Sequence, residues 1–254
     1  MSNEGKVAIV TGGSSGIGRA TCVALSKEGY HVVVVGTNSE RINETLNLLH
    51  TPVLNKLHSS HLGLVLDVTK ETDMQAMVSK TVERFGRIDI LVASAGLGKR
   101  AGSNRLIPFP TASVPLEEWN EILNVNLTGV FLSNRAVLPI MMTQSVGHII
   151  NICSSTTSYG LRGQPYAPAY CASKFGVQGF TESLAEEVRS YGIRVQALFP
   201  GYVKTPLVAE TTLANIYGGS MNADNVAASI TYLVTQTMDM VVVHPHLIPF
   251  RGVQ

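Results

Sequence analysis

The sequence has little charge and few residues that would mark a metal site. Charged side chains make up 15% of the 254 residues and the formal net charge is +1, so neither a nucleic acid nor an anionic membrane is indicated as a partner. The low charge suggests that much of the surface is either buried between subunits or unusually apolar. The three cysteines, Cys22, Cys153 and Cys171, are odd in number and lack metal-ligand spacing, so we expect reduced buried thiols and no bound metal.

The sequence also lacks a long apolar run near its start, an internal repeat and any low-complexity tract. The first hydrophobic run begins at Val7 and ends at Thr11-Gly12-Gly13, which is too short for a signal sequence or a membrane span. A chain of this length can bury a large core. We therefore expect a soluble, cytoplasmic protein folded as one domain over residues 1–254.

Short apolar runs alternate with stretches of helical periodicity from end to end. Such runs are typical of strands buried on both faces of a parallel sheet. The expected strands are 7–10, 31–36, 64–66, 88–92, 148–152, 194–199 and 240–243, and the expected helices are 19–28, 39–49, 70–85, 116–142, 170–191 and 223–233. This order predicts the α/β class: a doubly wound (Rossmann) parallel sheet of seven strands with helices on both faces.

A glycine-rich segment, TGGSSGIG at 11–18, lies between the first expected strand and the first expected helix. Glycines at such a turn let the backbone approach a pyrophosphate, and the helix N-terminus offers N–H donors and positive potential. A plain glycine-rich turn is the alternative. The pattern predicts a dinucleotide site that uses Gly12, Ser14, Ser15, Gly16, Ile17 and Gly18.

The end of the second expected strand bears on the choice between NAD and NADP. An acid there would bind the 2′-hydroxyl of NAD, whereas an NADP site avoids the acid and offers donors. Here Thr37 and Asn38 precede any acid, and Arg41 follows a turn later. This favours NADP(H), with NAD(H) as the alternative. Ser39 is expected to cap the next helix.

Several polar or small residues follow the other strands, where an open α/β sheet binds its ligands. Asp67, beside Val68, is predicted either to accept from an adenine amine or to cap the following helix. Ser94, Ala95 and Gly96 leave room for a ribose or nicotinamide. The loop 97–115, with three basic residues, is either a solvated loop, or a lid or patch that attracts an anionic group of the substrate.

Tyr170 and Lys174 are one helical turn apart, so they share a face of the expected helix. An ammonium at that distance favours the phenolate and lowers the pKa of the tyrosine, which suits an acid–base pair. An amphipathic helix with a solvated lysine is the plain alternative. A second unusual feature is the run of Asn and Gly at 124–129 inside a long helix, where poor helix formers tend to mark a functional or strained site.

Taken together, these motifs resemble the short-chain dehydrogenase/reductase family over nearly the whole chain. The motifs are 11–18, Asn126, Ser154 or Ser155, Tyr170 with Lys174, and Pro200-Gly201 followed by Val203 and Thr205. The resemblance implies that Tyr170 is the general acid/base, that Lys174 lowers its pKa and holds the nicotinamide ribose, and that Asn126 positions a water in a proton relay. Val203 and Thr205 would contact the nicotinamide carboxamide.

Two departures from the family pattern stand out. Ala93-Ser94-Ala95-Gly96 replaces the usual Asn-Asn-Ala-Gly, which removes two amides that tie neighbouring strands. The number of residues between the serine and Tyr170 is larger than is usual in the family, so Ser155 stays an alternative to Ser154 as the residue that binds the substrate oxygen.

The resemblance implies an oxidoreductase that interconverts a carbonyl and a secondary alcohol by hydride transfer with NADP(H). The alternative is a regulatory protein that senses NAD(P) without turnover; a sugar-nucleotide epimerase would need a longer C-terminal part. Residues 203–222 are expected to face a small-molecule substrate. A homotetramer or homodimer, paired through the helices near 116–142 and 170–191, would suit the low charge.

Overall fold

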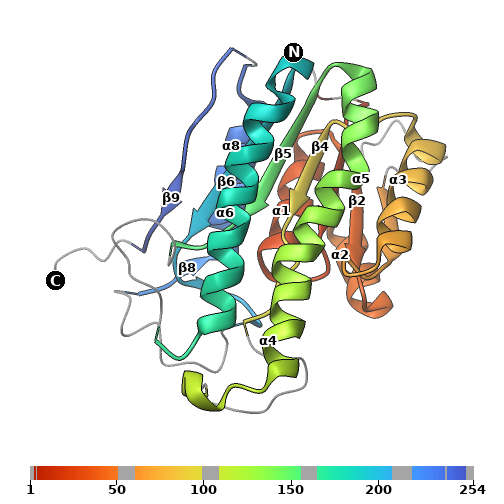
Figure 1. The fold of residues 1–254 in the computed structure, drawn as a ribbon. Coiled ribbons are helices and arrows are strands. Elements are labelled where there is room, and N and C mark those ends of the chain that lie inside the picture. The colour runs from red at the N-terminus through yellow and green to blue at the C-terminus, as the bar shows by residue number, and fades with distance from the viewer. Residues whose placement is uncertain are drawn as a thin grey trace, which may run out of the picture.

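The protein is described by a computed structural model that covers residues 3, 5–50, 61–98, 109–155, 165–207, 219–237 and 239–249. A parallel sheet forms its centre, with the strand order β3-β2-β1-β4-β5-β6-β9 (Figure 1). The strands are β1 (Val7–Thr11), β2 (His31–Gly36), β3 (His61–Val65), β4 (Ile90–Ala93), β5 (Gly147–Ile152), β6 (Ile193–Pro200) and β9 (His246–Leu247). The chain adds strands outward from β1 to β3 on one side and from β4 onward on the other, so the boundary between β1 and β4 is the switch point at which such sheets bind ligands.

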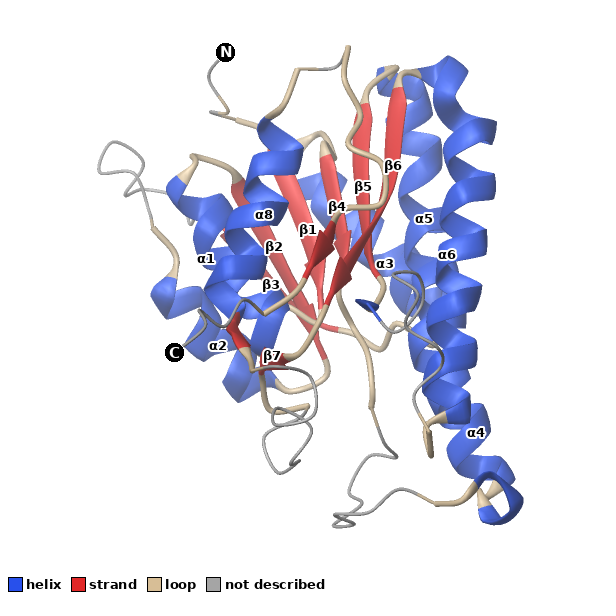
Figure 2. Ribbon diagram, turned by 90° about the vertical axis from the view of Figure 1, so that its left-hand side faces the viewer, coloured by secondary structure: helices blue, strands red, loops and turns tan. Residues whose placement is uncertain are grey.

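Helices cover both faces of the sheet, as Figure 2 shows. One face carries α1 (Gly16–Lys27), α2 (Ser39–Leu48) and α8 (Ala223–Thr235). The other carries α3 (Glu71–Phe85), α5 (Gly129–Gln144) and α6 (Pro168–Val188), with α4 (Leu116–Leu123) extending from α5. The described residues also form two short 3-10 turns, η2 (Thr111–Ser113) and η5 (Arg189–Tyr191), and a two-stranded pair, β7 (Val203–Lys204) with β8 (Met221–Asn222).

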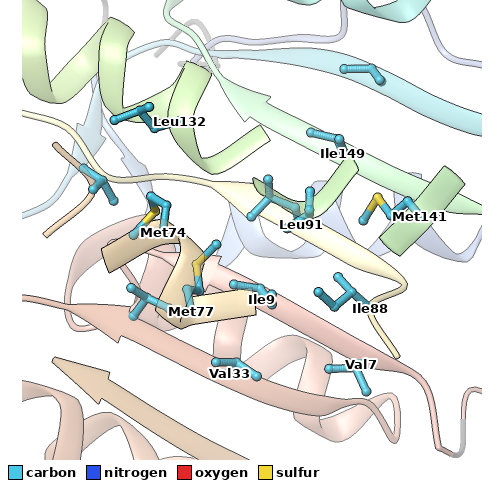
Figure 3. Close-up of a cluster of buried hydrophobic side chains, with 14 of the residues drawn as sticks. Val7, Ile9, Val33, Met74, Met77, Ile88, Leu91, Leu132, Met141 and Ile149 are labelled. Atoms are coloured by element: carbon cyan, nitrogen blue, oxygen red, sulfur yellow. The ribbon is translucent and has the colours of Figure 1, made fainter. Parts of the chain in front are cut away.

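The alternation of side chains along β1 explains why both faces are covered. Val7 and Ile9 belong to the cluster under α3, α5 and α6, whereas Ala8 and Val10 belong to the cluster under α1, α2 and α8. Figure 3 shows the first cluster, in which Met74 and Met77 lie near Ile9. A strand that is apolar at every position is stable only between two such layers.

The seven-stranded α/β sheet predicted from the sequence is confirmed, but its last strand was predicted at the wrong place. Residues 240–243 form no strand, and β9 at His246–Leu247 pairs with β6 instead. Backbone hydrogen bonds hold this segment to β6: Phe199 N donates to Pro245 O at 3.0 Å, and Gly201 N donates to Leu247 O at 2.6 Å. The apolar run at 240–243 had the composition of a strand, yet pairing depends on which residues reach the edge of β6.

The predicted irregularity in the long helix takes a definite form. Residues Asn124–Thr128 make a π-helical turn, η3, between α4 and α5. Among the described residues, one helical run, Leu116–Gln144, is apolar and long enough to cross a membrane by length and composition alone. Leu132, Val137 and Met141 of this run lie in the core under the sheet, so packing inside a globular domain accounts for its composition.

Candidate active site

The glycine-rich turn leads from the end of β1 directly into α1. Gly12 has φ +68°, and a Cβ there would lie 2.8 Å from the backbone of Ala95, while a Cβ at Gly18 would lie 2.2 Å from Gly12 O. Both positions therefore require glycine. Ser15 is the N-cap residue of α1 and makes no side-chain capping bond. The turn thus presents the first N–H groups of α1, as a pyrophosphate cradle must.

The remaining residues predicted in this turn support its shape. A Cβ at Gly36, at the end of β2, would lie 2.8 Å from Ser14 Oγ, so Ser14 lies against that strand end. Ile17 packs on the core under α1. A Cβ at Gly16 would lie 3.2 Å from Thr205, so Thr205, which directly follows β7, borders the same turn. The fold therefore brings the two ends of the predicted cofactor site together.

The end of β2 is exposed and is capped differently from the prediction. Asn38, not Ser39, is the N-cap of α2, because its Oδ1 accepts from Arg41 N at 2.9 Å. Capping occupies the amide oxygen, so Asn38 offers a ligand its Nδ2 donor. Thr37 is exposed beside it. The position after β2 thus carries uncharged groups.

Arg19 links this region to the glycine-rich turn. Its guanidinium donates to Ser14 O at 2.7 Å and to Thr45 Oγ1 at 3.0 Å, and it pairs with Glu44 at 2.8 Å. The charge of Arg19 is therefore directed at α2 and the turn itself.

Asp67 stabilises a turn rather than a helix end. Its Oδ1 accepts from the backbone N and the hydroxyl of Thr69 at 3.0 and 2.8 Å. Since α3 begins at Glu71 with Lys70 as its N-cap residue, the alternative in which Asp67 caps this helix is wrong. Val68 is buried in the core.

The segment after β4 is held by a residue that the sequence analysis did not single out. Thr11 Oγ1 accepts from Ser94 N at 3.2 Å and from Ala95 N at 3.4 Å, and Thr11 O accepts from Ser94 N at 3.2 Å. The end of β1 is thereby tied to the end of β4, where the family's amides are missing. A hydroxyl at the last position of a buried strand was the signal that could have identified Thr11.

Tyr170 and Lys174 lie near the start of α6, against the end of β5. The phenol of Tyr170 is hydrogen-bonded to the side chain of Ser154. Lys174 Nζ donates to Ile152 O at 2.8 Å and lies 5.8 Å from the centroid of the Tyr170 ring. Ser155 lies elsewhere, because a Cβ at Gly201 would be 3.5 Å from Ser155 Oγ. Of the two candidate serines, Ser154 is the one that faces the tyrosine.

Burial dominates the ionisation of this pair. Removal from water raises the pKa of Tyr170, and the hydrogen bond from Ser154 only partly opposes it. Burial likewise lowers the pKa of Lys174. For the chain alone, the net pKa of Tyr170 is therefore raised, since desolvation of the phenolate is the larger effect, and the lowering expected from Lys174 stays a prediction.

Asn126 is fully buried in the π-helical turn, and its carboxamide holds the chain after Gly96. Its Oδ1 accepts from Leu97 N at 2.7 Å, and its Nδ2 donates to Leu97 O at 2.9 Å and to Ser173 Oγ at 3.1 Å. A Cβ at Gly96 would lie 3.4 Å from Asn126 Oδ1 and 3.8 Å from Lys174 Nζ. The predicted residues Asn126, Ser154, Tyr170 and Lys174 thus come from three elements to one place.

The segment after β6 approaches the glycine-rich turn, because Thr205 lies next to Gly16. Pro200 ends β6, Gly201 is bonded to the segment of β9, and Val203 is buried in β7. Residues 99–108 of the predicted loop 97–115, the hydroxyl residues 156–158 and residues 208–218 of the predicted substrate segment 203–222 lie outside the described residues. Within the described part of the chain, no cluster of His, Cys, Asp and Glu could hold a metal ion.

Comparisons with known proteins identify the family. A sequence profile of the family described as short chain dehydrogenase matches residues 6–215. The 3-oxoacyl-acyl-carrier-protein reductase FabG of Thermotoga maritima is 34% identical over 243 residues, which cover 92% of each protein.

Two solved structures share the fold. The 3-ketoacyl-(acyl-carrier-protein) reductase of Brucella melitensis, complexed with NADH, has a TM-score of 0.83 at 28% identity and covers 96% of this chain and 97% of that chain. The alcohol dehydrogenase of the archaeon Thermococcus sibiricus, complexed with 5-hydroxy-NADP, has a TM-score of 0.81 at 26% identity and covers 96% of each. The chain belongs to the short-chain dehydrogenase/reductase family and is an oxidoreductase of that family, whose members use NAD(P)(H).

Proposed function

We propose that this protein reduces a carbonyl group to a secondary alcohol, and catalyses the reverse reaction, with NADP(H) as the preferred cofactor. The observation that carries the proposal is the hydrogen bond between Ser154 and the phenol of Tyr170, with Lys174 one turn away and 5.8 Å from the ring centroid. A hydroxyl pair at the carboxyl end of β5 is where a substrate oxygen can receive two donors.

The turn around Gly12 and Gly18 is the proposed dinucleotide cradle. A Cβ at Gly12 would clash with the backbone of Ala95 and one at Gly18 with Gly12 O, so the two glycines keep the turn tight against the N-terminus of α1, where a pyrophosphate would bind. The pyrophosphate would lie on the N-terminus of α1, with the nicotinamide end toward Thr205 and Val203. Thr37 and Asn38 at the adenosine end carry no negative charge that would repel a 2′-phosphate. NADPH bound there supplies the hydride.

Tyr170 acts as the proton donor to the substrate oxygen. Because burial raises its pKa, the phenol is protonated near neutral pH, which is the state that carbonyl reduction requires. With substrate bound, the single hydroxyl proton of Ser154 would turn from the phenol to the same substrate oxygen as a second donor. Lys174 has three donors, one of which Ile152 O accepts, so the others suit the ribose hydroxyls. Asn126 positions a water through which the proton is replaced from solvent.

The substrate is a small molecule, and residues 203–222 form the segment that faces it. We further propose that the protein is cytoplasmic and works as a homotetramer or homodimer. The exposed aromatic rings on the outer face of α5 and α6, Phe131 at 39% and Phe175 at 46% exposure, are the contacts that a second copy would bury.

The function is tested by titrating the purified protein with NADPH and NADH and then measuring turnover with a panel of ketones, aldehydes and 3-oxo acids. We expect NADPH to bind more tightly and Tyr170→Phe to lower kcat by about 10²–10⁴-fold. Tyr30→Phe is the matched control, because Tyr30 is buried outside the site. Cofactor binding without turnover on any substrate would favour the sensing protein instead.

A further inference from the structure

Ser173 lies inside the catalytic helix but was not assigned a role. It sits on α6 between Tyr170 and Lys174, and its side chain is fully buried. We propose that Ser173 is a positioning residue: its hydroxyl fixes the carboxamide of Asn126, and through it the backbone of Leu97, against the catalytic helix. The expected effect of Ser173 on turnover rests on the proposed function. Its expected effect on the backbone of Leu97 rests on the geometry alone.

The hydroxyl of Ser173 has a defined direction. Its Oγ lies 2.7 Å from Tyr170 O, and since a carbonyl oxygen only accepts, the hydroxyl proton is committed to that bond. Toward Asn126 the same oxygen can therefore act only as an acceptor. Asn126 Nδ2, at 3.1 Å, supplies the matching donor. The contact joins a site residue on η3 to the backbone of Tyr170.

Both N–H groups and the oxygen of the Asn126 carboxamide have partners, which are Leu97 and Ser173. Leu97 uses both its N–H and its C=O on this side chain, at 2.7 and 2.9 Å, and so determines which end of the amide faces which way. Ser173 takes the remaining N–H and so determines where the amide lies relative to α6. Asn126 and Ser173 are both fully buried. Loss of the Ser173 hydroxyl would therefore leave an N–H of Asn126 without an acceptor, which costs enough free energy to displace the carboxamide.

A displacement of this carboxamide reaches the reacting groups. The space beside Gly96 is bordered by Asn126 Oδ1 and by Lys174 Nζ, 3.4 and 3.8 Å from the position of a Cβ there. Leu97 continues this segment away from β4. Ser173 therefore acts on the site through Asn126 and the segment at Gly96 and Leu97, without touching the substrate.

The alternative role for Ser173 is simple helix packing, and the chain offers a matched control for it. Ser133 on α5 is also fully buried, and its hydroxyl donates to Gly129 O of its own helix at 2.7 Å. Its other neighbour is Met74 Sδ at 3.3 Å, in the core and away from the site. If burial of a helical hydroxyl were all that mattered, Ser173→Ala and Ser133→Ala would behave alike.

The first measurement is amide hydrogen exchange at Leu97 in the protein without substrate, compared with the melting temperature of each variant. We expect Ser173→Ala to speed exchange of the Leu97 N–H by about 10-fold, the effect of one lost hydrogen bond, and Ser133→Ala to leave it within about 2-fold. Unchanged protection of Leu97 in Ser173→Ala would overturn the proposal, whether or not the protein turns over a substrate.

The second measurement is kinetic. With a carbonyl substrate that the wild type reduces, Ser173→Ala should lower kcat by about 10-fold and leave KM for NADPH within about 2-fold, and Ser173→Thr, which keeps the hydroxyl, should restore most of the loss. In an Asn126→Ala background, Ser173→Ala should add less than about 2-fold. Equal losses in both backgrounds would show that Ser173 does not act through Asn126. Absence of wild-type turnover would count against the proposed function and leave the exchange result to decide on Ser173.

Discussion

Ser154 and Tyr170 meet through their side-chain oxygens, whereas the adjacent Ser155 faces Gly201. The end of β5 and the first turns of α6 are held together at this point by Lys174, whose Nζ donates to Ile152 O. Two serines of equal burial are thus distinguished by direction alone, because successive residues leaving a strand point to opposite sides.

The first prediction follows from that distinction. Ser154→Ala should lower kcat for carbonyl reduction by about 10²-fold, the typical loss when one donor to a reacting oxygen is removed. Ser155→Ala should stay within about 3-fold of the wild type, since its hydroxyl lies toward Gly201. Steady-state kinetics on the two variants tests this prediction. A larger loss of kcat in Ser155→Ala than in Ser154→Ala would assign the contact with the substrate oxygen to Ser155.

Cofactor preference should respond to a charge at Thr37. In Thr37→Asp a carboxylate at the exposed end of β2 repels the 2′-phosphate of NADPH and can accept from the 2′-hydroxyl of NADH. KM for NADPH should rise by about 10-fold or more while KM for NADH stays equal or falls. Thr37→Asn, similar in size but uncharged, is the control. A wild type that already prefers NADH would contradict the proposed choice of cofactor.

His148 should make the fold sensitive to mild acid. It is buried in β5, and burial together with the charge of Arg194 lowers its pKa to about 3. Gln196 Nε2 donates to Val242 O, so its Oε1 accepts from His148 Nε2, which therefore carries the proton.

The sign follows from linkage. Below pH 6.5 the histidine of the unfolded chain takes up a proton, whereas His148 in the folded chain stays neutral. The free energy of unfolding therefore keeps its full value above pH 6.5. Between pH 6.5 and 3 it falls by about 1.4 kcal/mol per pH unit because of this residue. Urea unfolding at pH 7.5, 6 and 5 should show a shallower loss of stability in His148→Gln. His244→Gln, at a side chain that is 41% exposed, is the comparison variant. Identical slopes in all three proteins would contradict this account of His148.

The assembly should depend on the outer face of α5. Phe131 packs edge-on against Phe180 at 5.9 Å and under the guanidinium of Arg135 at 5.1 Å, yet 39% of it stays exposed. Phe131→Glu should reduce the molar mass measured by light scattering, because a charge cannot be buried unpaired between two copies. Tyr191→Glu, at a ring 46% exposed on η5, is the control. A monomeric wild type, or an unchanged mass in Phe131→Glu, would remove this face from consideration.

The local features of the fold could be predicted from the sequence because they depend on neighbours in the chain. Unbroken apolar runs such as Val32–Val35 indicate strands buried on both faces, and the class and the number of strands follow from their alternation with helices. The glycine spacing at 11–18 and the one-turn spacing of Tyr170 and Lys174 are likewise properties of short segments. The position of β9 was missed because a two-residue edge strand has no periodicity of its own.

The contacts between segments were decided only by the tertiary structure. Thr11 reaches the backbone after β4 because β1 and β4 are adjacent in the sheet, and Ser173 reaches Asn126 because α6 packs on η3. The pKa of Tyr170 is raised because burial removes the phenol from water, an effect that depends on how many segments surround it. Sequence by itself determined which residue types stand at the ends of the strands. Packing determined which of them meet, since a side chain's partners and its access to water come from elements far away in the chain.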